Sequence, residues 1–227
     1  MNTPTRFIGE GVPVVLSPDE RQVILRVPAK DSRLTLLNIE TGEVRGLETD
    51  RNRPLIHSEF VSYFPDGRRI AFEATEPTGG SRIYFQDLTG GKPICFTPDE
   101  RGVAMRSNHS ISPEGAWIML MDSANRVCLY CIADGRPDVL DKLGSGLYPI
   151  GWMPGGENIL LQRWGEIPLV VYRYNLASGT LDEWLSLDPG RRSGATRILS
   201  LRLAPDGRSY AYGIRKGSSD LYAFELD

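Results

Sequence analysis

The chain has 227 residues, of which 41% are hydrophobic and 24% are charged, and its formal net charge at pH 7 is −3. This composition is typical of a folded protein with a sizeable core, and it excludes a disordered chain and a strongly basic nucleic-acid-binding domain. Because the chain is not basic, we expect no nucleic-acid partner. No window approaches the roughly 18 apolar residues of a membrane span, so we expect no membrane insertion. Three cysteines are too few for a disulfide framework.

A proline turn recurs five times along the chain. The copies are Ser17-Pro18-Asp19-Glu20-Arg21, Phe64-Pro65-Asp66-Gly67-Arg68, Ser112-Pro113-Glu114-Gly115, Met153-Pro154-Gly155-Gly156 and Ala204-Pro205-Asp206-Gly207-Arg208. Their prolines are 47, 48, 41 and 51 residues apart. Proline presets φ for the second position of a tight turn, and Asp and Gly suit the positions after it. Each copy therefore predicts a hairpin turn. Four copies have an acidic residue there, for which we expect a structural role: Asp19, Asp66, Glu114 and Asp206.

Two short strands follow each turn at nearly constant offsets. A first strand is predicted at residues 22–27, 69–73, 116–120, 158–161 and 209–213. A second strand is predicted at residues 34–39, 83–88, 127–132, 170–176 and 221–226. In the first four copies another turn with glycine comes next, such as Thr41-Gly42. Each repeat thus holds strand a before the proline turn, b after it, c next and d after the glycine turn.

Four antiparallel strands in each repeat match the blade of a β-propeller, for which about 40 to 50 residues are usual. We therefore predict an all-β fold in which residues 1–227 form a single β-propeller domain of about five four-stranded blades. The approximate blade bounds are 13–50, 58–97, 108–141, 148–187 and 198–227, the last completed by residues 4–9. In this hypothesis the N- and C-terminal strands pair, which closes the ring and leaves no free sheet edge.

At these residues the chain resembles the TolB-like, WD-repeat-like (PD40-type) propeller family. The blade motif of that family is a Ser-Pro-Asp-Gly turn, an Ile-Ala-Phe-type strand and a Tyr-x-x-Asp/Asn-Leu hairpin. The segment 148–222 is also similar to the C-terminal propellers of bacterial Ser/Thr protein kinases and transcriptional regulators, which implies a sensor or interaction module detached from a larger signalling protein. The chain departs from the motif at Glu20, where the family has Gly, and at Gly155, where it has Asp.

Sequence signatures of catalysis are absent. The chain has no Gly-x-Ser-x-Gly elbow, no P-loop and no Gly-x-Gly-x-x-Gly phosphate cradle, so we expect no catalytic residue and no cofactor. Cys128 and Cys131 have the spacing of a redox pair or half a zinc site. They fall within a predicted strand, where residues three apart point to opposite faces of the sheet. We therefore interpret both cysteines as packing residues and expect no metal site.

The two histidines are candidate binding residues because of their place in the repeat. His57 and His109 lie eight and four residues before the prolines of their repeats, at the start of strand a, which is innermost in a propeller. If the a-to-b turns lie on one face, the d-to-a connections lie on the other, and both histidines should sit near the channel mouth on that second face. The alternative for each is a partly exposed histidine without a role.

Several arginines belong to the long connections of the same d-to-a face. Arg53, Arg106 and Arg197 are the candidates beside the two histidines. Arginine suits bidentate contacts with carboxylates, so this surface predicts an acidic partner. The alternative is a solvated rim of mixed charge.

From these features we predict a non-catalytic binding or sensor module that presents a propeller face to a protein or peptide, with a small ligand as a second option. The alternatives are a hydrolase or lyase that uses His57 or His109 as a base in the channel, and a structural domain that packs on a catalytic partner. The first residues show no export signal, so the cytoplasm is the default location.

Overall fold

The computed structural model describes residues 10–27, 32–49, 54–76, 79–97, 102–163, 165, 167–190, 195–203 and 209–216. Within these residues the regular structure consists of β-strands and the short 3-10 helix η1 (Asp141–Leu143). The strands expected to close the ring, 4–9 and 221–226, lie outside the described residues, as does Arg53.

The strands form five antiparallel sheets that follow one another along the chain. The first contains β1 (Val12–Leu16), β2 (Gln22–Val27), β3 (Arg33–Asn38) and β4 (Val44–Gly46). The second contains β5 (Ile56–Tyr63), β6 (Arg69–Thr75), β7 (Ser81–Asp87) and β8 (Ile94–Cys95). The third contains β9 (Trp117–Met121), β10 (Val127–Cys131) and β11 (Pro137–Val139). The fourth contains β12 (Leu147–Trp152), β13 (Asn158–Arg163), β14 (Leu169–Asn175) and β15 (Leu181–Leu187). The described part of the fifth contains β16 (Ala195–Leu203) and β17 (Tyr210–Lys216).

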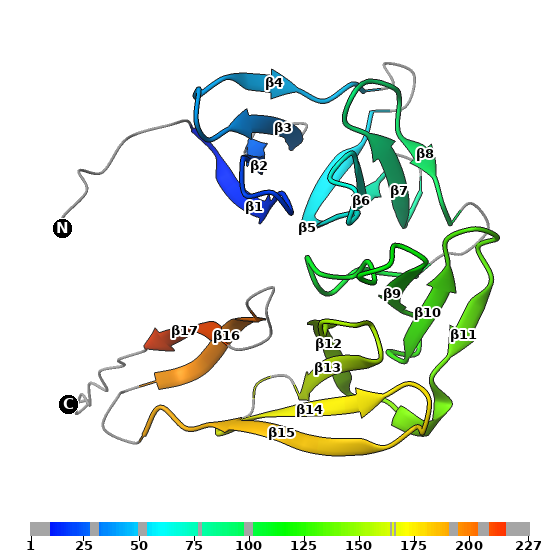
Figure 1. The fold of residues 1–227 in the computed structure, drawn as a ribbon, viewed down its shortest axis with the longest axis vertical. Helices are drawn as coiled ribbons and strands as arrows, with labels where there is room; N and C mark the ends of the chain where they lie inside the picture. The colour runs from blue at the N-terminus through cyan, green and yellow to red at the C-terminus, as the bar shows by residue number, and fades with distance from the viewer. Residues whose placement is uncertain are drawn as a thin grey trace, which may run out of the picture.

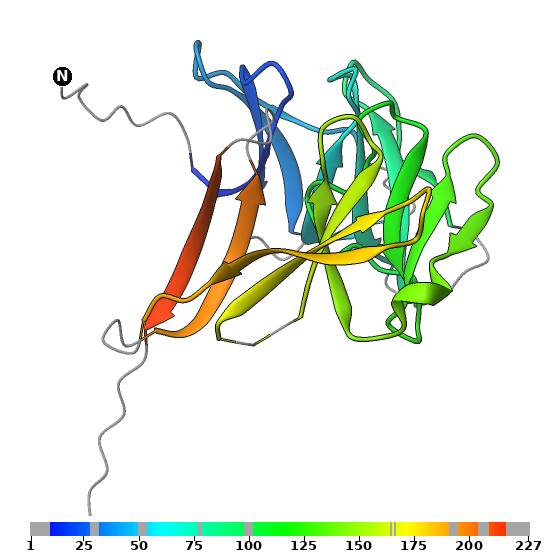
Figure 2. The same ribbon diagram turned by 60° about the horizontal axis from the view of Figure 1, so that its bottom comes forward.

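The sheets are the blades of a propeller, which confirms the predicted all-β fold class. Figure 1 shows β1, β5, β12 and β16 toward the middle of the arrangement and β4, β8, β11 and β15 at its outside. In the third sheet the backbone before β9 forms two isolated bridges, Ala104 with Met121 and Ile111 with Ile118. The tilted view in Figure 2 shows the sheets side by side, from β1–β4 in blue to β16–β17 in orange.

The proline turns form as the repeat predicts. In the second turn the backbone N–H of Gly67 donates to the carbonyl of Phe64 at 2.9 Å, and in the third that of Gly115 donates to Ser112 at 2.9 Å. The Oδ1 of Asp66 accepts the backbone N–H of Arg68 at 2.8 Å, so this carboxylate caps its own turn.

Strand a departs from regular pairing in every blade where it is a named strand. The register against strand b shifts in β1 between Pro13 and Val15, in β5 between His57 and Val61, and in β12 between Pro149 and Gly151. Strand β16 also has register shifts. Such bulges bend a strand and change the direction of its side chains. The inner strands are therefore irregular in each of these blades, and one outer pair, β14 with β15, also shifts register between Val171 and Tyr172.

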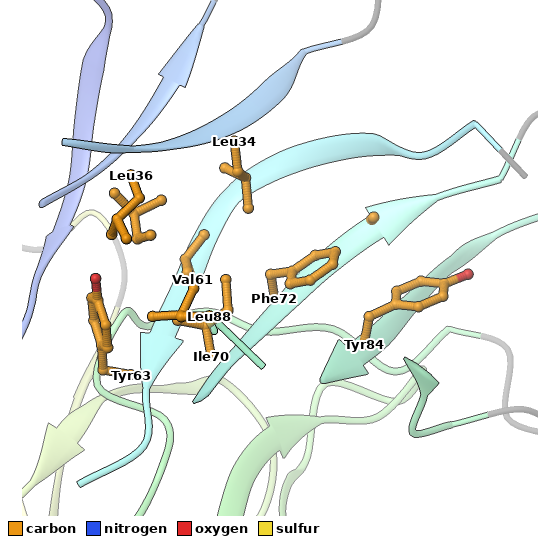
Figure 3. Packing of buried hydrophobic residues seen from close by; sticks show 10 residues of the cluster. Leu34, Leu36, Val61, Tyr63, Ile70, Phe72, Tyr84 and Leu88 are labelled. Atoms are coloured by element: carbon orange, nitrogen blue, oxygen red, sulfur yellow. The ribbon is translucent and has the colours of Figure 1, made fainter. Parts of the chain in front are cut away.

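Neighbouring blades are joined by apolar side chains on both faces of strand b. In β6, Ile70 and Phe72 pack with residues of the first blade such as Leu34, as Figure 3 shows, whereas Ala71 packs with residues of the third blade. Residues 70–74 are all buried as a result. Strand β6 is therefore buried on both faces, because each of its faces covers a different neighbouring blade.

This packing predicts that Phe72→Ala lowers the free energy of unfolding by roughly 3–5 kcal/mol, because a fully buried phenyl ring leaves a cavity between two blades. Val44→Ala, on the outer strand at 52% exposure, should change it by less than about 0.5 kcal/mol. Urea unfolding curves of both variants measure the difference. Equal losses would show that the junction between the first two blades is not a main source of stability.

Candidate functional site

A cavity of about 750 Å³ lies among the inner strands of the first four blades. Apolar side chains from each of these blades form much of its wall. Examples are Val14 and Leu16 from the first blade, Tyr63 from the second, Ile111 from the third and Trp152 from the fourth. A volume of several hundred Å³ with apolar walls is typical of binding sites. The cavity is therefore the candidate functional site in the described part of the chain.

The proline turns form a collar around this cavity. Pro18, Pro65, Pro113 and Pro154 all line it. Each turn packs against the proline of the preceding blade: a Cβ built on Gly67 lies 3.8 Å from Cδ of Pro18, and one on Gly115 lies 3.4 Å from Cδ of Pro65. A Cβ built on Gly156 likewise lies 3.7 Å from Cδ of Pro113. These contacts between successive turns fix the collar in place.

Asn108 joins three blades at the cavity wall. Its Oδ1 accepts the backbone N–H of Val61 from the second blade at 3.1 Å. Its Nδ2 donates to the backbone carbonyl of Val14 from the first blade at 3.0 Å. The side chain itself belongs to the third blade and is buried. Because the bulges in β1 and β5 leave backbone groups without ladder partners nearby, a buried amide at this position satisfies two of them.

Other polar groups of the wall are also engaged within the protein. The Oγ of Ser62 accepts the N–H of Ile111 at 3.2 Å, and the Oγ of Ser112 accepts that of Trp117 at 3.0 Å. The indole Nε1 of Trp152 donates to the carbonyl of Ser110 at 2.9 Å, which holds the ring in place. The side chains of the wall are therefore ordered before a ligand binds.

Tyr63 is an exception among these polar groups. Its hydroxyl is buried without a hydrogen-bond partner in the structure, and burial raises the pKa of the phenol well above its usual value. Figure 3 shows this hydroxyl directed toward Leu36, in the junction between the first two blades. The ring of Tyr63 thus contributes apolar surface to the cavity, while its hydroxyl lies in the packing behind the wall.

His57 was expected near the channel mouth, but the structure places its side chain in the packing between blades. Its side chain is buried, at 6% exposure, between the first two blades. A carbonyl can only accept, so Nδ1 carries the proton that is donated to the backbone oxygen of Ser32 at 3.0 Å. The ring centroid lies 5.0 Å from that of Phe72. Burial lowers the pKa of His57 to about 4, so the imidazole is neutral at pH 7 and acts in packing.

His109 lines the central cavity and is exposed there. The expected place was the face opposite the proline turns, but the structure puts this residue in the same cavity as those turns. Its main chain is positioned by the Oγ of Ser107, which accepts the His109 N–H at 3.0 Å. A Cβ on Gly151 would come within 2.9 Å of the His109 Cβ, so the fourth blade approaches closely because it has glycine at this position.

Of the predicted arginines, the two that the structure describes, Arg106 and Arg197, lie away from the cavity wall. Arg106 lies between the second and third blades, with Nη1 4.0 Å from Oε2 of Glu73 and its guanidinium 6.0 Å from the ring centre of Phe60. The buried carboxylate of Glu73 also accepts the N–H of Met105 at 3.0 Å, and burial raises its pKa. Arg197 is half-buried in β16. Neither arginine is among the described residues of the cavity wall.

Sequence reasoning missed the large apolar residues of the wall, although the repeat contains the signal. Leu16, Tyr63, Ile111 and Trp152 each occupy the second position before the proline of their turn. All four line the cavity. An alignment of the repeats on their prolines would have found this set, because it shows which positions are large and apolar in each copy.

Cys128 and Cys131 both lie in β10, where Cys128 is buried and Cys131 is partly exposed. Among the residues that the structure describes, no group of three or more His, Cys, Asp or Glu side chains could hold a metal ion. Within the same residues, no helix is long and apolar enough to span a bilayer.

No protein-family model matches the chain, and no curated protein matches it. Among solved structures, it is similar to a TolB-type protein from Agrobacterium tumefaciens, with 17% identity over 91% of this chain and 70% of the other, at a TM-score of 0.70. TolB from Acinetobacter baumannii matches at 17% identity over 92% of this chain and 47% of that one, with a TM-score of 0.63.

An oligogalacturonate lyase from Vibrio parahaemolyticus matches at 14% identity over 85% of this chain and 55% of the other, with a TM-score of 0.58. The chain thus spans about half the length of this lyase and of the Acinetobacter protein. Likeness at these identities shows a shared fold, and the resemblance to TolB-type propellers is confirmed at that level.

The burial of His57 predicts a specific pH dependence. The unfolded chain binds a proton on this imidazole near pH 6.5, whereas the folded protein binds it only near pH 4. As the pH falls from 6.5 to 4 the unfolded state therefore gains the proton first, and stability falls by roughly 3 kcal/mol, levelling off below that range.

Urea unfolding of wild type and His57→Gln between pH 7.5 and 3.5 measures this effect, and the variant should lack this part of the decline. Glu73 acts in the opposite direction, because its raised pKa favours the folded state as the pH falls, so the difference between the two proteins is the quantity to compare. Parallel curves for wild type and His57→Gln would mean that His57 is not held neutral by burial.

Proposed function

We propose that this chain is a non-catalytic binding module that holds an apolar segment of a protein partner in its central cavity. The observation that carries the proposal is the cavity of about 750 Å³ whose wall is built from apolar side chains of four successive blades. Burying such surface drives association, because apolar area leaves water on both partners.

The rigidity of the wall supports a binding role. Asn108 and the indole of Trp152 are held by hydrogen bonds to other strands, and the proline collar packs turn against turn. A site that is ordered before binding loses little conformational entropy when the partner arrives. The collar also presents a ring of flat proline surfaces at the mouth, which suits a chain segment entering from outside.

The chemistry of the wall supports binding over catalysis. The hydroxyls of Ser62 and Ser112 accept backbone N–H groups, so both side chains have a structural role in the wall. His57, the other base considered for a hydrolase or lyase, is buried between blades. An enzyme of these classes needs a base and its reacting partners within hydrogen-bond reach in one pocket.

The resemblance to propellers of kinases and transcriptional regulators gives the setting that we propose for this module, a bacterial signalling protein. The acidic partner inferred from the arginine rim has less support, because Arg106 lies beside the carboxylate of Glu73 and outside the described wall of the cavity. An apolar segment fits the described wall better than an acidic one.

A random library of 12-residue peptides displayed on phage tests the proposal. Peptides selected on the wild-type protein are synthesised and titrated against Leu16→Asp, which places a carboxylate on an apolar side chain of the wall that is 46% exposed. We expect affinity to fall about tenfold or more, because the acid must be desolvated against the bound segment.

Ile94→Asp is the matched control, since it changes an apolar residue that is 73% exposed on the outer strand β8. It should leave the affinities unchanged. If the selected peptides bind Leu16→Asp with the wild-type affinity, the binding surface lies elsewhere. A small ligand that occupies the cavity in place of a peptide would also bind Leu16→Asp more weakly. Measurable turnover abolished by His109→Ala would favour the enzyme.

A further inference from the structure

Glu20 breaks the repeat at a position where the other turns have glycine. In the first turn the backbone N–H of Glu20 donates to the carbonyl of Ser17 at 2.9 Å, the same bond that Gly67 makes to Phe64 and Gly115 makes to Ser112. The three residues are therefore structurally equivalent. All three have left-handed backbone, with φ of 60° at Glu20, 66° at Gly67 and 73° at Gly115.

Glutamate is an unfavourable residue in this conformation. In left-handed backbone the Cβ of an L-residue crowds the following carbonyl, which glycine avoids. Glycine at position 20 would therefore adopt this backbone conformation with less strain. Residues that hold strained backbone conformations cluster at functional sites, where the side chain is needed for another reason.

The side chain of Glu20 lines the central cavity and is exposed. Within the described wall there is no lysine or arginine, and the charged side chain present is Glu20. The neighbouring carboxylate of Asp19 is engaged within the turn: hydrogen bonds from the Ser17 hydroxyl and then from the Arg21 backbone N–H lower its pKa. The carboxylate of Glu20 thus gives the described wall a negative charge on its first-blade side.

We propose that Glu20 binds a positively charged group of the segment that occupies the cavity, so that the partner presents a lysine or arginine beside an apolar side chain. The inference rests on the proposed binding function and adds the charge of the partner. Charge complementarity carries it: an apolar body is buried among Leu16, Trp152 and the prolines, while a cation on the same segment reaches the carboxylate at the wall. The exposed imidazole of His109 lines the same cavity and offers a further polar contact.

Three acetylated and amidated tetrapeptides test the proposal. They share a tryptophan and differ at the next residue, which is lysine, glutamine or glutamate. Titration at low salt should show the lysine peptide binding wild type about fivefold more tightly than the glutamine peptide, and the glutamate peptide binding most weakly, as expected of a partly exposed ion pair. In Glu20→Gln the three affinities should converge. Glu43→Gln, which removes an exposed carboxylate from the glycine turn of the same blade, should keep the wild-type order.

Glu20→Gly gives a second, opposing readout. Replacing the strained glutamate by the residue that the other turns use should raise the melting temperature by roughly 2–4 °C. The same variant should lose the preference for the lysine peptide. A gain in stability together with a loss of selectivity separates a binding role from a structural one, because a glutamate kept for the fold would show a loss of stability.

The outcomes distinguish this inference from the proposed function. Equal binding of the three peptides to wild type, with all of them weakened by Leu16→Asp, would overturn the role of Glu20 and keep the apolar cavity as the site. Preference for the glutamate peptide would also overturn it. Binding of all three peptides that is insensitive to Leu16→Asp would overturn the cavity as the site and this inference with it.

Discussion

The second, third and fourth blades of this molecule bury both faces of their sheets, and the rest of the structure depends on that packing. A sheet of four strands cannot cover itself, so each blade supplies the apolar cover for the next. Strand b carries most of this contact: in β6 the side chains of Ile70 and Phe72 serve one neighbour while Ala71 serves the other. Because the contacts run from blade to blade, the positions of the inner strands around the centre follow from packing between the outer parts of the sheets.

The central cavity is the geometric result of this arrangement. Sheets that pack side by side and twist cannot all bring their inner strands to one point, so space is left at the centre. The inner strands bulge to fit that geometry, and the amide of Asn108 pairs with two backbone groups beside the bulges, the N–H of Val61 and the carbonyl of Val14. A site of this kind needs no special loop, because its wall consists of residues that the fold already holds in place.

The fold could be predicted from the sequence because its signals are local. Proline turns and short apolar runs recur at regular intervals, and each strand b or c is recognisable within about six residues of sequence. The environment of His57 could not be predicted in this way, because its burial depends on Ser32 and Phe72, which belong to different blades. The surroundings of Arg106 could not be predicted for a similar reason, because the carboxylate beside it is that of Glu73 in β6 of the second blade. A linear pattern places a residue on a face of the propeller, but which neighbouring blade covers it depends on the register between sheets.

The packing of each turn against the preceding proline has a consequence for how such a protein can diverge. Leu16, Tyr63, Ile111 and Trp152 are contributed one per repeat, each from the same position of a tandem copy. A point substitution at one of them changes one sector of the wall and leaves the other sectors and the collar as they were. Binding specificity can therefore change through one repeat at a time. The blade junctions that keep the molecule folded tolerate fewer substitutions and change more slowly.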